Sequence, residues 1–353
     1  MRKNIFFVKE QEQSEKAGRR MEYRDAYDRD FRKIVGASPN ERGRKSQNAE
    51  QRMMDMKEPR QSAAAGPLLI LLAGVLWGSM GLFVRRLGAA GFSSLQITAG
   101  RLLFSAVSFW ILLLFRPPEE RRIRLRDLPL FLGLGLVSVL FFTVCYFSAI
   151  ELMPLSTAAI LLYTAPIWVT LLSALLFRDR LTLPGLLALA MAFGGCVLVS
   201  GVRGGGLTPR GLLLGLGAGL GYGLYSIFGS VALRRYSPYT VTAWGFLIAA
   251  AGACAICRPG EAIATLLAAP SPVGTALFFV FTALFTAVAP YLCYTLGLRT
   301  VRPGSAAIFA TVEPVVASLL GVLVFHEALT PGALCGILLV LGAVVLLSLT
   351  KKE

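Results

Sequence analysis

Histidine and clustered acidic side chains are scarce in this sequence. Its 353 residues contain one histidine, His326, and 20 Asp and Glu, of which 11 lie within residues 1–62. The six cysteines are scattered among apolar runs, and the single CxxC, Cys254 to Cys257, has no second pair and no histidine nearby. Metal centres and hydrolytic sites need such residues in groups. We therefore expect no metal and no cofactor. An intramembrane enzyme or a channel is kept only as an alternative to the function that the rest of the sequence indicates.

Extended polar stretches are absent after residue 62. The chain is 55% hydrophobic with a mean hydropathy of +0.65, whereas soluble domains average about 45–50% apolar residues. Ten apolar runs of membrane-spanning length follow the polar start, with short connections between them. They cover residues 67–84, 93–115, 128–150, 155–176, 183–202, 211–233, 239–257, 273–298, 303–325 and 330–350. This pattern predicts an all-α polytopic membrane protein with ten transmembrane helices.

Residues 1–62 differ from the rest of the chain because they are polar and carry both charge signs. They hold 16 Lys and Arg and 11 Asp and Glu, without a hydrophobic period. Such a segment cannot bury enough apolar surface to fold alone, so we expect a disordered basic cytoplasmic tail. It shows no nucleic-acid-binding motif, and we expect no such partner despite the net charge of +15. Met53, Met54 and Met56 leave open an alternative, in which translation starts there.

Positive charge at the ends of the apolar runs predicts their orientation. If the N-terminus is cytoplasmic, the cytoplasmic loops and C-terminus carry 13 Lys and Arg without the tail, and the opposite side carries 5. Loops rich in Lys and Arg stay in the cytoplasm. We therefore expect both termini inside, in the cell (inner or plasma) membrane.

The chain contains an internal repeat. A shift of 148 residues aligns "TAAILLYTAPIWVTLLSALLFRDRLT" (157–182) with "SAAIFATVEPVVASLLGVLVFHEALT" (305–330), and about fifteen of 45 positions across 156–200 are identical. This predicts two five-helix repeats, residues 63–202 and 203–350. Because five is odd, the second repeat enters the membrane from the other side, as the arginines of "FRDRLT" and their absence from "FHEALT" also indicate. Inverted repeats are typical of alternating-access carriers with a midplane substrate site.

Three motifs carry a resemblance to a known family. They are "LWGS" at Leu76–Ser79, Arg101 in "TAGRLLF", and the two P…(F)x(D/E)xLT units. Over about residues 65–350 the chain resembles the EamA family of the drug/metabolite transporter superfamily, although the first unit has Asp179 where the family usually has glutamate. The resemblance implies a secondary-active or facilitative transporter of small organic metabolites. It favours amino acids or related compounds as substrates and export as the direction. Other branches of the superfamily carry nucleotide sugars, sugar phosphates or purines.

Glu313 is the one acid in the central part of a predicted span. Ten helical residues after Pro303 cover about 15 Å, half of a hydrocarbon core of about 30 Å. A charge there costs a few kcal/mol. Glu313 either carries a proton or binds a substrate cation, or it is a buried polar group that stabilises a kink before Pro314. Pro314 and its repeat equivalent Pro166 predict breaks in both helices.

Arg101 and a set of aromatic residues complete the candidate site. Arg101, inside the second span, has either a structural partner such as Glu151 or a substrate carboxylate as its ligand. Aromatic side chains with polar tips can line an amphipathic pocket, and each alone can also be core packing. They are Trp77, Tyr146, Tyr163, Tyr222, Tyr225, Tyr291 and Tyr294. The expected partners are a small-molecule substrate, the lipid bilayer and protons as a coupling ion, and the sequence leaves the oligomeric state open.

Overall fold

Ten helical spans make up most of the described part of the chain. The computed structural model describes residues 65–153, 155–201, 208–256, 259–326, 328 and 330–350, so the predicted tail lies outside it. The ten-helix prediction is confirmed, and the first span is longer than expected. The spans cover Ala65–Ala89, Ser94–Leu114, Leu125–Leu152, Thr157–Phe177, Leu183–Ser200, Pro209–Ala232, Pro238–Ile256, Pro272–Gly297, Pro303–Val324 and Pro331–Thr350.

Five of the spans are single helices and five are interrupted. The single ones are α5 (Ser94–Leu114), α10 (Leu183–Ser200), α11 (Pro209–Ala232), α12 (Pro238–Ile256) and α18 (Pro331–Thr350). The interrupted spans consist of α3 (Ala65–Gly78) with α4 (Met80–Ala89); α6 (Leu128–Leu132), η3 (Gly133–Phe141) and α7 (Phe142–Leu152); α8 (Leu155–Leu162) with α9 (Ala165–Phe177); α14 (Pro272–Ala283), η4 (Leu284–Val288) and α15 (Ala289–Gly297); and α16 (Pro303–Ala310) with α17 (Val312–Phe325).

Backbone contacts divide the chain into two units. The larger comprises residues 61–170 and 181–353, and it contains the candidate site described below. The smaller comprises residues 1–60 and 171–180. Of the smaller unit, the structure describes only residues 171–180, which are the second part of α9 and the turn after it.

The breaks in spans 4 and 9 follow from their prolines. A proline has no N–H for the carbonyl four residues earlier, and its ring collides with that turn. α8 ends at Leu162, four residues before Pro166, and α16 ends at Ala310, four residues before Pro314. The second half-helix begins at Ala165, one residue before Pro166, in span 4 and at Val312, two residues before Pro314, in span 9. Both repeats therefore contain a half-helix that starts inside the span.

The other interruptions were not evident from the sequence. Spans 3 and 8 contain π-helical segments, η3 and η4, which overlap when the repeats are aligned. Span 1 breaks at Ser79, whose hydroxyl donates to the Leu76 carbonyl at 2.7 Å. The counterpart of span 1 is the uninterrupted α11, so the two repeats differ at this point.

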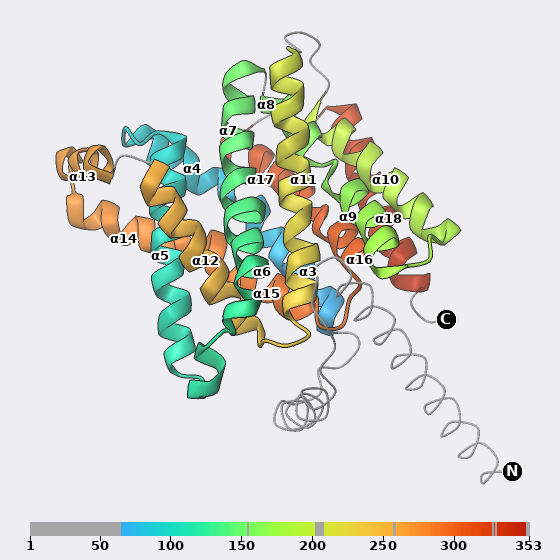
Figure 1. Ribbon diagram of the computed structural model, residues 1–353. Coiled ribbons are helices and arrows are strands. Elements are labelled where there is room, and N and C mark those ends of the chain that lie inside the picture. Colours follow the sequence, from blue (N-terminus) through green and yellow to red (C-terminus); the bar gives the residue numbers. More distant parts are fainter. Residues whose placement is uncertain are drawn as a thin grey trace, which may run out of the picture. The chain divides into compact units, whose positions relative to one another are not determined.

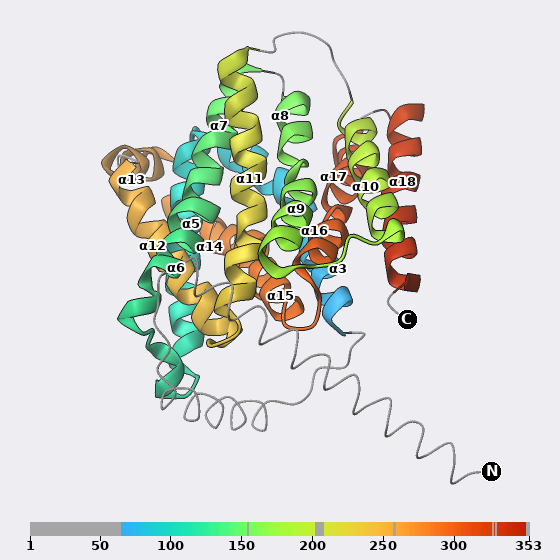
Figure 2. The same ribbon diagram turned by 45° about the vertical axis from the view of Figure 1, so that its right-hand side comes forward.

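The packing of the helices repeats when the two halves are exchanged. Span 1 packs on spans 8 and 9, and span 6 packs on spans 3 and 4 in the same way. Spans 2 and 7 pair with each other, as do spans 5 and 10, where α10 and α18 lie side by side in both views (Figures 1 and 2). A Cβ on Gly195 would lie 2.7 Å from the Gly336 carbonyl oxygen, so this pair approaches backbone to backbone. The pattern is consistent with the inverted repeat.

In the described part of the chain, one α-helix outside the ten spans was missed. Residues expected to form a loop between spans 7 and 8 include α13 (Pro259–Ala268), seen at the edge of Figure 1. Its Leu266 packs against the buried side chains of Leu87, Phe92 and Phe279. At ten residues it is too short to span a bilayer, which is why a search for long apolar runs passes over it.

A polar contact joins the two repeats at one end of spans 3 and 6. Asp127, 7% exposed, accepts from Arg235 Nη1 at 2.9 Å and from the Tyr236 hydroxyl at 2.6 Å. The backbone N–H of Arg124 donates to the same tyrosine oxygen. Burial and the bond to the carboxylate raise the pKa of Tyr236 to about 12. The hydroxyl therefore keeps its proton and remains a donor at physiological pH.

Candidate functional site

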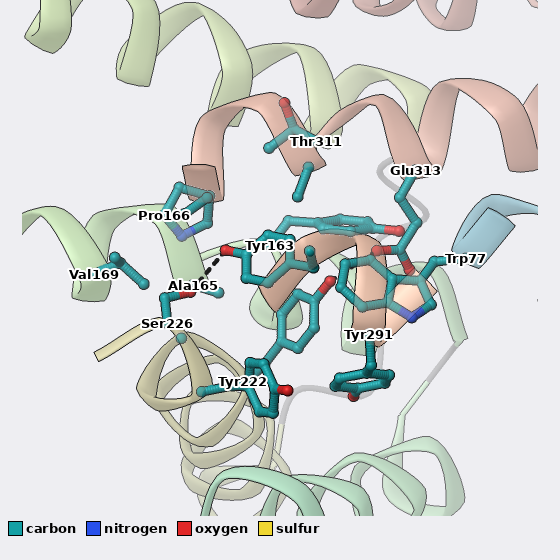
Figure 3. Close-up of a pocket in the computed structure, with 15 residues that line it drawn as sticks. Trp77, Tyr163, Ala165, Pro166, Val169, Tyr222, Ser226, Tyr291, Thr311 and Glu313 are labelled. Atoms are coloured by element: carbon teal, nitrogen blue, oxygen red, sulfur yellow. Dashed lines mark hydrogen bonds between the residues drawn. The ribbon is translucent and has the colours of Figure 1, made fainter. Parts of the chain in front are cut away.

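A pocket lies where spans 4 and 9, which break at Pro166 and Pro314, meet spans 1, 6 and 8. Both repeats contribute to its wall, and Pro166 and Glu313 stand on opposite sides of it in Figure 3. The lining residues are Trp77, Tyr163, Ala165, Pro166, Val169, Tyr222, Gly223, Tyr225, Ser226, Tyr291, Tyr294, Ala307, Ala310, Thr311 and Glu313.

Glu313 lies in the first turn of α17 and is held by a tyrosine. The Tyr222 hydroxyl of α11 donates to Glu313 Oε2 at 3.0 Å. The N-terminus of a helix carries a partial positive charge, which stabilises a nearby carboxylate. The break before Pro314 thus places the N-terminus of α17 beside Glu313, the only carboxyl among the lining residues, where it stabilises the charged form. Among the described residues, no Lys, Arg or His lines the pocket with Glu313.

Six of the fifteen lining residues are aromatic. Trp77 of α3 meets Tyr291 edge to face, with ring centroids 5.0 Å apart, and lies 6.1 Å from Tyr222 and 5.4 Å from Tyr294. These separations are within the range in which aromatic pairs attract each other. Tyr225 makes a further edge contact with Tyr291 at 5.0 Å. These rings come from three spans and both repeats, and a cation inside the pocket would lie among them.

Hydroxyl pairs fix the two deepest tyrosines. Tyr225 and Thr295 are 2.9 Å apart, and Thr295 in turn donates to the Tyr291 carbonyl at 2.6 Å. Tyr225 is therefore the donor to Thr295. Ser226 and Tyr294 share a bond of 2.7 Å. With both hydroxyls satisfied, these tyrosines present their rings to the pocket and their polar tips to the protein.

Glycines bring the neighbouring helices close to the breaks. A Cβ on Gly78 of α3 would lie 2.5 Å from the carbonyl oxygen of Glu313. A Cβ on Gly223 of α11 would lie 3.1 Å from the carbonyl oxygen of Ala165, the repeat equivalent of Glu313. Each contact joins one repeat to the other. The two half-helix starts are thus held from the opposite repeat by backbone approach.

The pocket is narrow. The centre of a water molecule can reach only about 20 Å³ of the space between the lining side chains. This is room for one or two waters, whereas pockets that hold metabolites run to several hundred Å³. Any larger molecule therefore requires the helices around the pocket to move apart.

The structure places seven of the nine predicted site residues in the pocket. Tyr146 and Arg101 lie outside it, and Tyr146 packs instead among Phe142, Phe147 and other apolar side chains. Arg101 donates from Nη1 to the sulfur of Met80, not to the suggested Glu151, which is an exposed residue at the end of α7. Whether the lining residues bind substrate stays a prediction.

Sequence reasoning missed part of the wall. Ser226, Thr311 and the small residues Ala307 and Ala310 carry no strong signal, because hydroxyls and alanines are common throughout apolar helices. Thr311 sits at the break itself, where it donates to the Ile308 carbonyl at 2.6 Å. Counting back from Pro314 to the last residue that can keep its helical bond would have placed the break there.

The fold and this site define a multi-pass membrane transporter with duplicated five-helix halves. The sequence matches the EamA-like transporter family twice, over residues 64–201 and 209–349, and the chain belongs to that family. Its family members are transporters and not enzymes, as the resemblance in the sequence predicted.

Several characterised and uncharacterised proteins are similar along most of their length. An "Uncharacterized transporter" of Archaeoglobus fulgidus is 29% identical over 290 residues, 80% of this chain and 95% of the relative. The "Uncharacterized inner membrane transporter YedA" of Escherichia coli is 28% identical over 78% of this chain and 88% of its own. The "Threonine/homoserine exporter RhtA" of E. coli is 29% identical over 74% and 81%. A solved structure titled "Crystal structure of protein" has the same fold, with a TM-score of 0.68, 22% identity and coverage of 82% and 99%.

Proposed function

We propose that this transporter exports amino acids or closely related metabolites by alternating access at the pocket around Glu313. The protein sits in the cell membrane with both termini cytoplasmic, and protons supply the coupling. Residues 63–202 and 203–350 act as the two moving halves, and the seven lining residues predicted from the sequence contact the substrate. The basic tail, residues 1–62, takes no part.

The observation that supports this best is Glu313 itself. It is the only carboxyl in the pocket lining, it accepts a hydrogen bond from a neutral donor, and six aromatic side chains line the same pocket. A substrate ammonium would find both a counter-charge and cation–π partners there. The repeat equivalent of Glu313 is Ala165, and the same helix break forms around that alanine. An acid is therefore not needed to build the break, which favours a role in binding or coupling.

The pocket volume supports alternating access over a fixed channel. About 20 Å³ of reachable space does not admit an amino acid, and the wall is shared between the two halves. A rocking motion of one half against the other would open the site to one side at a time. Similarity to a protein named a threonine/homoserine exporter supports amino acids as the first substrates to test and export as the direction.

Counterflow in proteoliposomes tests the proposal. Vesicles loaded with about 10 mM unlabelled amino acid, which is above the usual KM range of about 1 μM to 1 mM, should transiently accumulate the labelled form from outside. Threonine, homoserine, leucine and phenylalanine form the first panel. A carrier gives such accumulation and a channel does not. The protein is first shown to be folded by its elution in size-exclusion chromatography. Absence of counterflow for all amino acids tested would then contradict the amino-acid proposal.

Glu313→Gln separates coupling from binding. The amide keeps the size and can accept from Tyr222, but it cannot release a proton. If protons couple through Glu313, accumulation driven by a pH gradient should be abolished while exchange at equal pH changes less than about 3-fold. If Glu313 binds the substrate cation, both activities should fall, by about 10-fold or more. Normal accumulation with unchanged affinity would leave Glu313 as a structural residue.

A further inference from the structure

Arg101 is a cation with an incomplete set of partners. It is the eighth residue of α5, its side chain is partly buried, and its Nη1 donates to the thioether of Met80. Its buried Nε has no hydrogen-bond partner within the described part of the chain. A guanidinium has five N–H donors, and a thioether is a weak acceptor. The structure thus holds a positive group inside a span against a neutral sulfur.

Such an arrangement lowers the stability of the folded protein, so a functional role is the expected reason for it. A buried charge without a hydrogen-bonded counter-ion costs several kcal/mol, and a charged side chain in a transmembrane helix is by default part of a functional site. A purely structural arginine would be expected to bond a carboxylate or several carbonyl oxygens. The carboxylate suggested by the sequence, Glu151, is exposed at the end of α7 and makes no such contact.

The position of Arg101 connects it to the pocket. Met80 is the first residue of α4, directly after the break at Ser79 and three residues from the pocket-lining Trp77. The charge of Arg101 is close enough to interact electrostatically with Tyr291 and Glu313, which both line the pocket. The thioether of Met80 belongs to a flexible, unbranched side chain that can change rotamer at little cost. The Met80 side chain therefore covers the guanidinium, and a stronger hydrogen-bond acceptor can displace it.

We propose that Arg101 is the carboxylate-binding residue of a two-point site in which Glu313 takes the ammonium, so that the substrate is a zwitterion. The proposal rests on the transport function proposed above and names its substrate class. On binding, the substrate carboxylate replaces the Met80 sulfur and accepts two parallel N–H bonds from the guanidinium. Amines without a carboxylate and acids without an amine each satisfy only one of the two buried charges.

Discrimination between an amino acid and its ester tests this site. The readout is inhibition of threonine, leucine or phenylalanine counterflow, whichever is fastest, by the free amino acid and by its methyl ester. The ester keeps the ammonium and removes the negative charge. Wild-type protein should bind the ester about 10–100-fold more weakly, as expected for loss of a charge-assisted bond. Equal inhibition by ester and amino acid would overturn the proposal without any variant.

Arg101→Gln and Arg101→Lys distinguish a binding role from a structural one. With Gln the preference for the amino acid over the ester should fall to within about 3-fold, because only the carboxylate contact is lost. Lys should retain part of the preference, since it keeps the charge but not the fork. If both variants weaken amino acid and ester by the same factor, Arg101 is structural and the proposal is wrong.

Met80→Leu serves as the matched variant on the other partner. Leucine keeps the apolar volume and removes the acceptor, so the amino acid should bind as tightly as in wild type or up to about 10-fold more tightly. A loss of binding larger than 10-fold would contradict the role of Met80 as a displaceable cover. Counterflow of amino acids and esters alike would leave the transport proposal standing and overturn only the two-point site, whereas absence of any amino-acid counterflow would overturn both.

Discussion

At the scale of single residues, Glu313 depends on a tyrosine and not on a basic side chain. Tyr222 donates to it at 3.0 Å. Alignment of "AGVLWGSMGLF" (73–83) with "AGLGYGLYSIF" (218–228) makes Trp77 the repeat equivalent of Tyr222, and the centroids of the two rings lie 6.1 Å apart. The two repeats have thus placed different aromatic residues at equivalent positions. Tyr222 carries a hydroxyl and Trp77 does not, and the lining acid, Glu313, belongs to the same repeat as Tyr222.

Tyr222→Phe should reduce apparent substrate affinity by about 10- to 150-fold. The ring stays, and the carboxyl loses its donor, which for a bond to a charged group is worth about 1.5–3 kcal/mol. The measurement is the concentration dependence of amino-acid counterflow. Tyr146→Phe is the control, because Tyr146 lies outside the pocket lining, and it should stay within about 2-fold of wild type. Equal losses for the two variants would show that the pocket is assigned to the wrong side chains.

At the scale of helices, the site depends on how closely α3 approaches the start of α17. Gly78 lies where a Cβ would meet the Glu313 carbonyl oxygen at 2.5 Å and Val316 at 2.7 Å. Gly81, in the second part of the same span, has nothing within 4 Å of the same position. One span therefore offers a tight glycine and an open glycine three residues apart.

Gly78→Ala should lower stability and transport, and Gly81→Ala should do neither. The backbone at Gly78 must move to admit a methyl group, at a cost of about 1–3 kcal/mol, and this displaces the first turn of α17 with Glu313. At Gly81 alanine favours the helix by about 0.5–1 kcal/mol. Thermal unfolding in detergent and counterflow measure both effects. A Gly78→Ala protein with wild-type melting and transport would contradict the close contact.

At the scale of the whole molecule, a polar contact at one end joins the repeats. Asp127 belongs to the first half, whereas Arg235 and Tyr236 belong to the second. The pairing of Asp127 with Arg235 is partly exposed, with side-chain exposures of 8% and 31%. Solvent screening weakens the attraction between these two charges. Most of the stabilisation by this contact therefore comes from the shorter hydrogen bond that Tyr236 donates to Asp127.

Asp127→Asn should destabilise the protein by about 1 kcal/mol, since two charge-assisted bonds become weaker neutral ones. The loss should appear as a lower apparent melting temperature in detergent and should shrink at high salt, because the wild-type pair is screened there. Glu119→Gln, at an exposed position in the same connection, should change stability by less than about 0.5 kcal/mol. A larger effect at Glu119 than at Asp127 would contradict this account of the contact.

The orientation of the two halves is tested by paired cysteines. Glu119 lies between spans 2 and 3, and Glu261 lies in α13 between spans 7 and 8, in the equivalent connection of the second repeat. Both side chains are exposed. In a background without native cysteines, Glu119→Cys should react with an impermeant maleimide only from the cytoplasm and Glu261→Cys only from outside. Labelling of both from the same side would contradict the inverted arrangement.

The sequence by itself determined the ten spans and the breaks in two of them. Ten spans follow from hydropathy alone, because a hydrocarbon core of about 30 Å demands about 20 apolar residues each time. The breaks at Leu162 and Ala310 are fixed by Pro166 and Pro314, since a missing N–H acts on the carbonyl four residues earlier whatever surrounds it. The position of Glu313 along its span, and the duplication that gives it Ala165 as a counterpart, are also legible in the sequence.

The tertiary structure decided which side chains meet. Tyr146 and Tyr294 are equivalent in the repeat, yet only Tyr294 lines the pocket, because that depends on how each helix is rotated about its axis. In a span that is apolar on every side, hydropathy has no period from which to read that rotation. The bond from Tyr222 to Glu313, the Met80 sulfur at Arg101 and the approach of Gly78 to α17 each join distant parts of the chain. Such contacts are set by packing between helices, which no local pattern specifies.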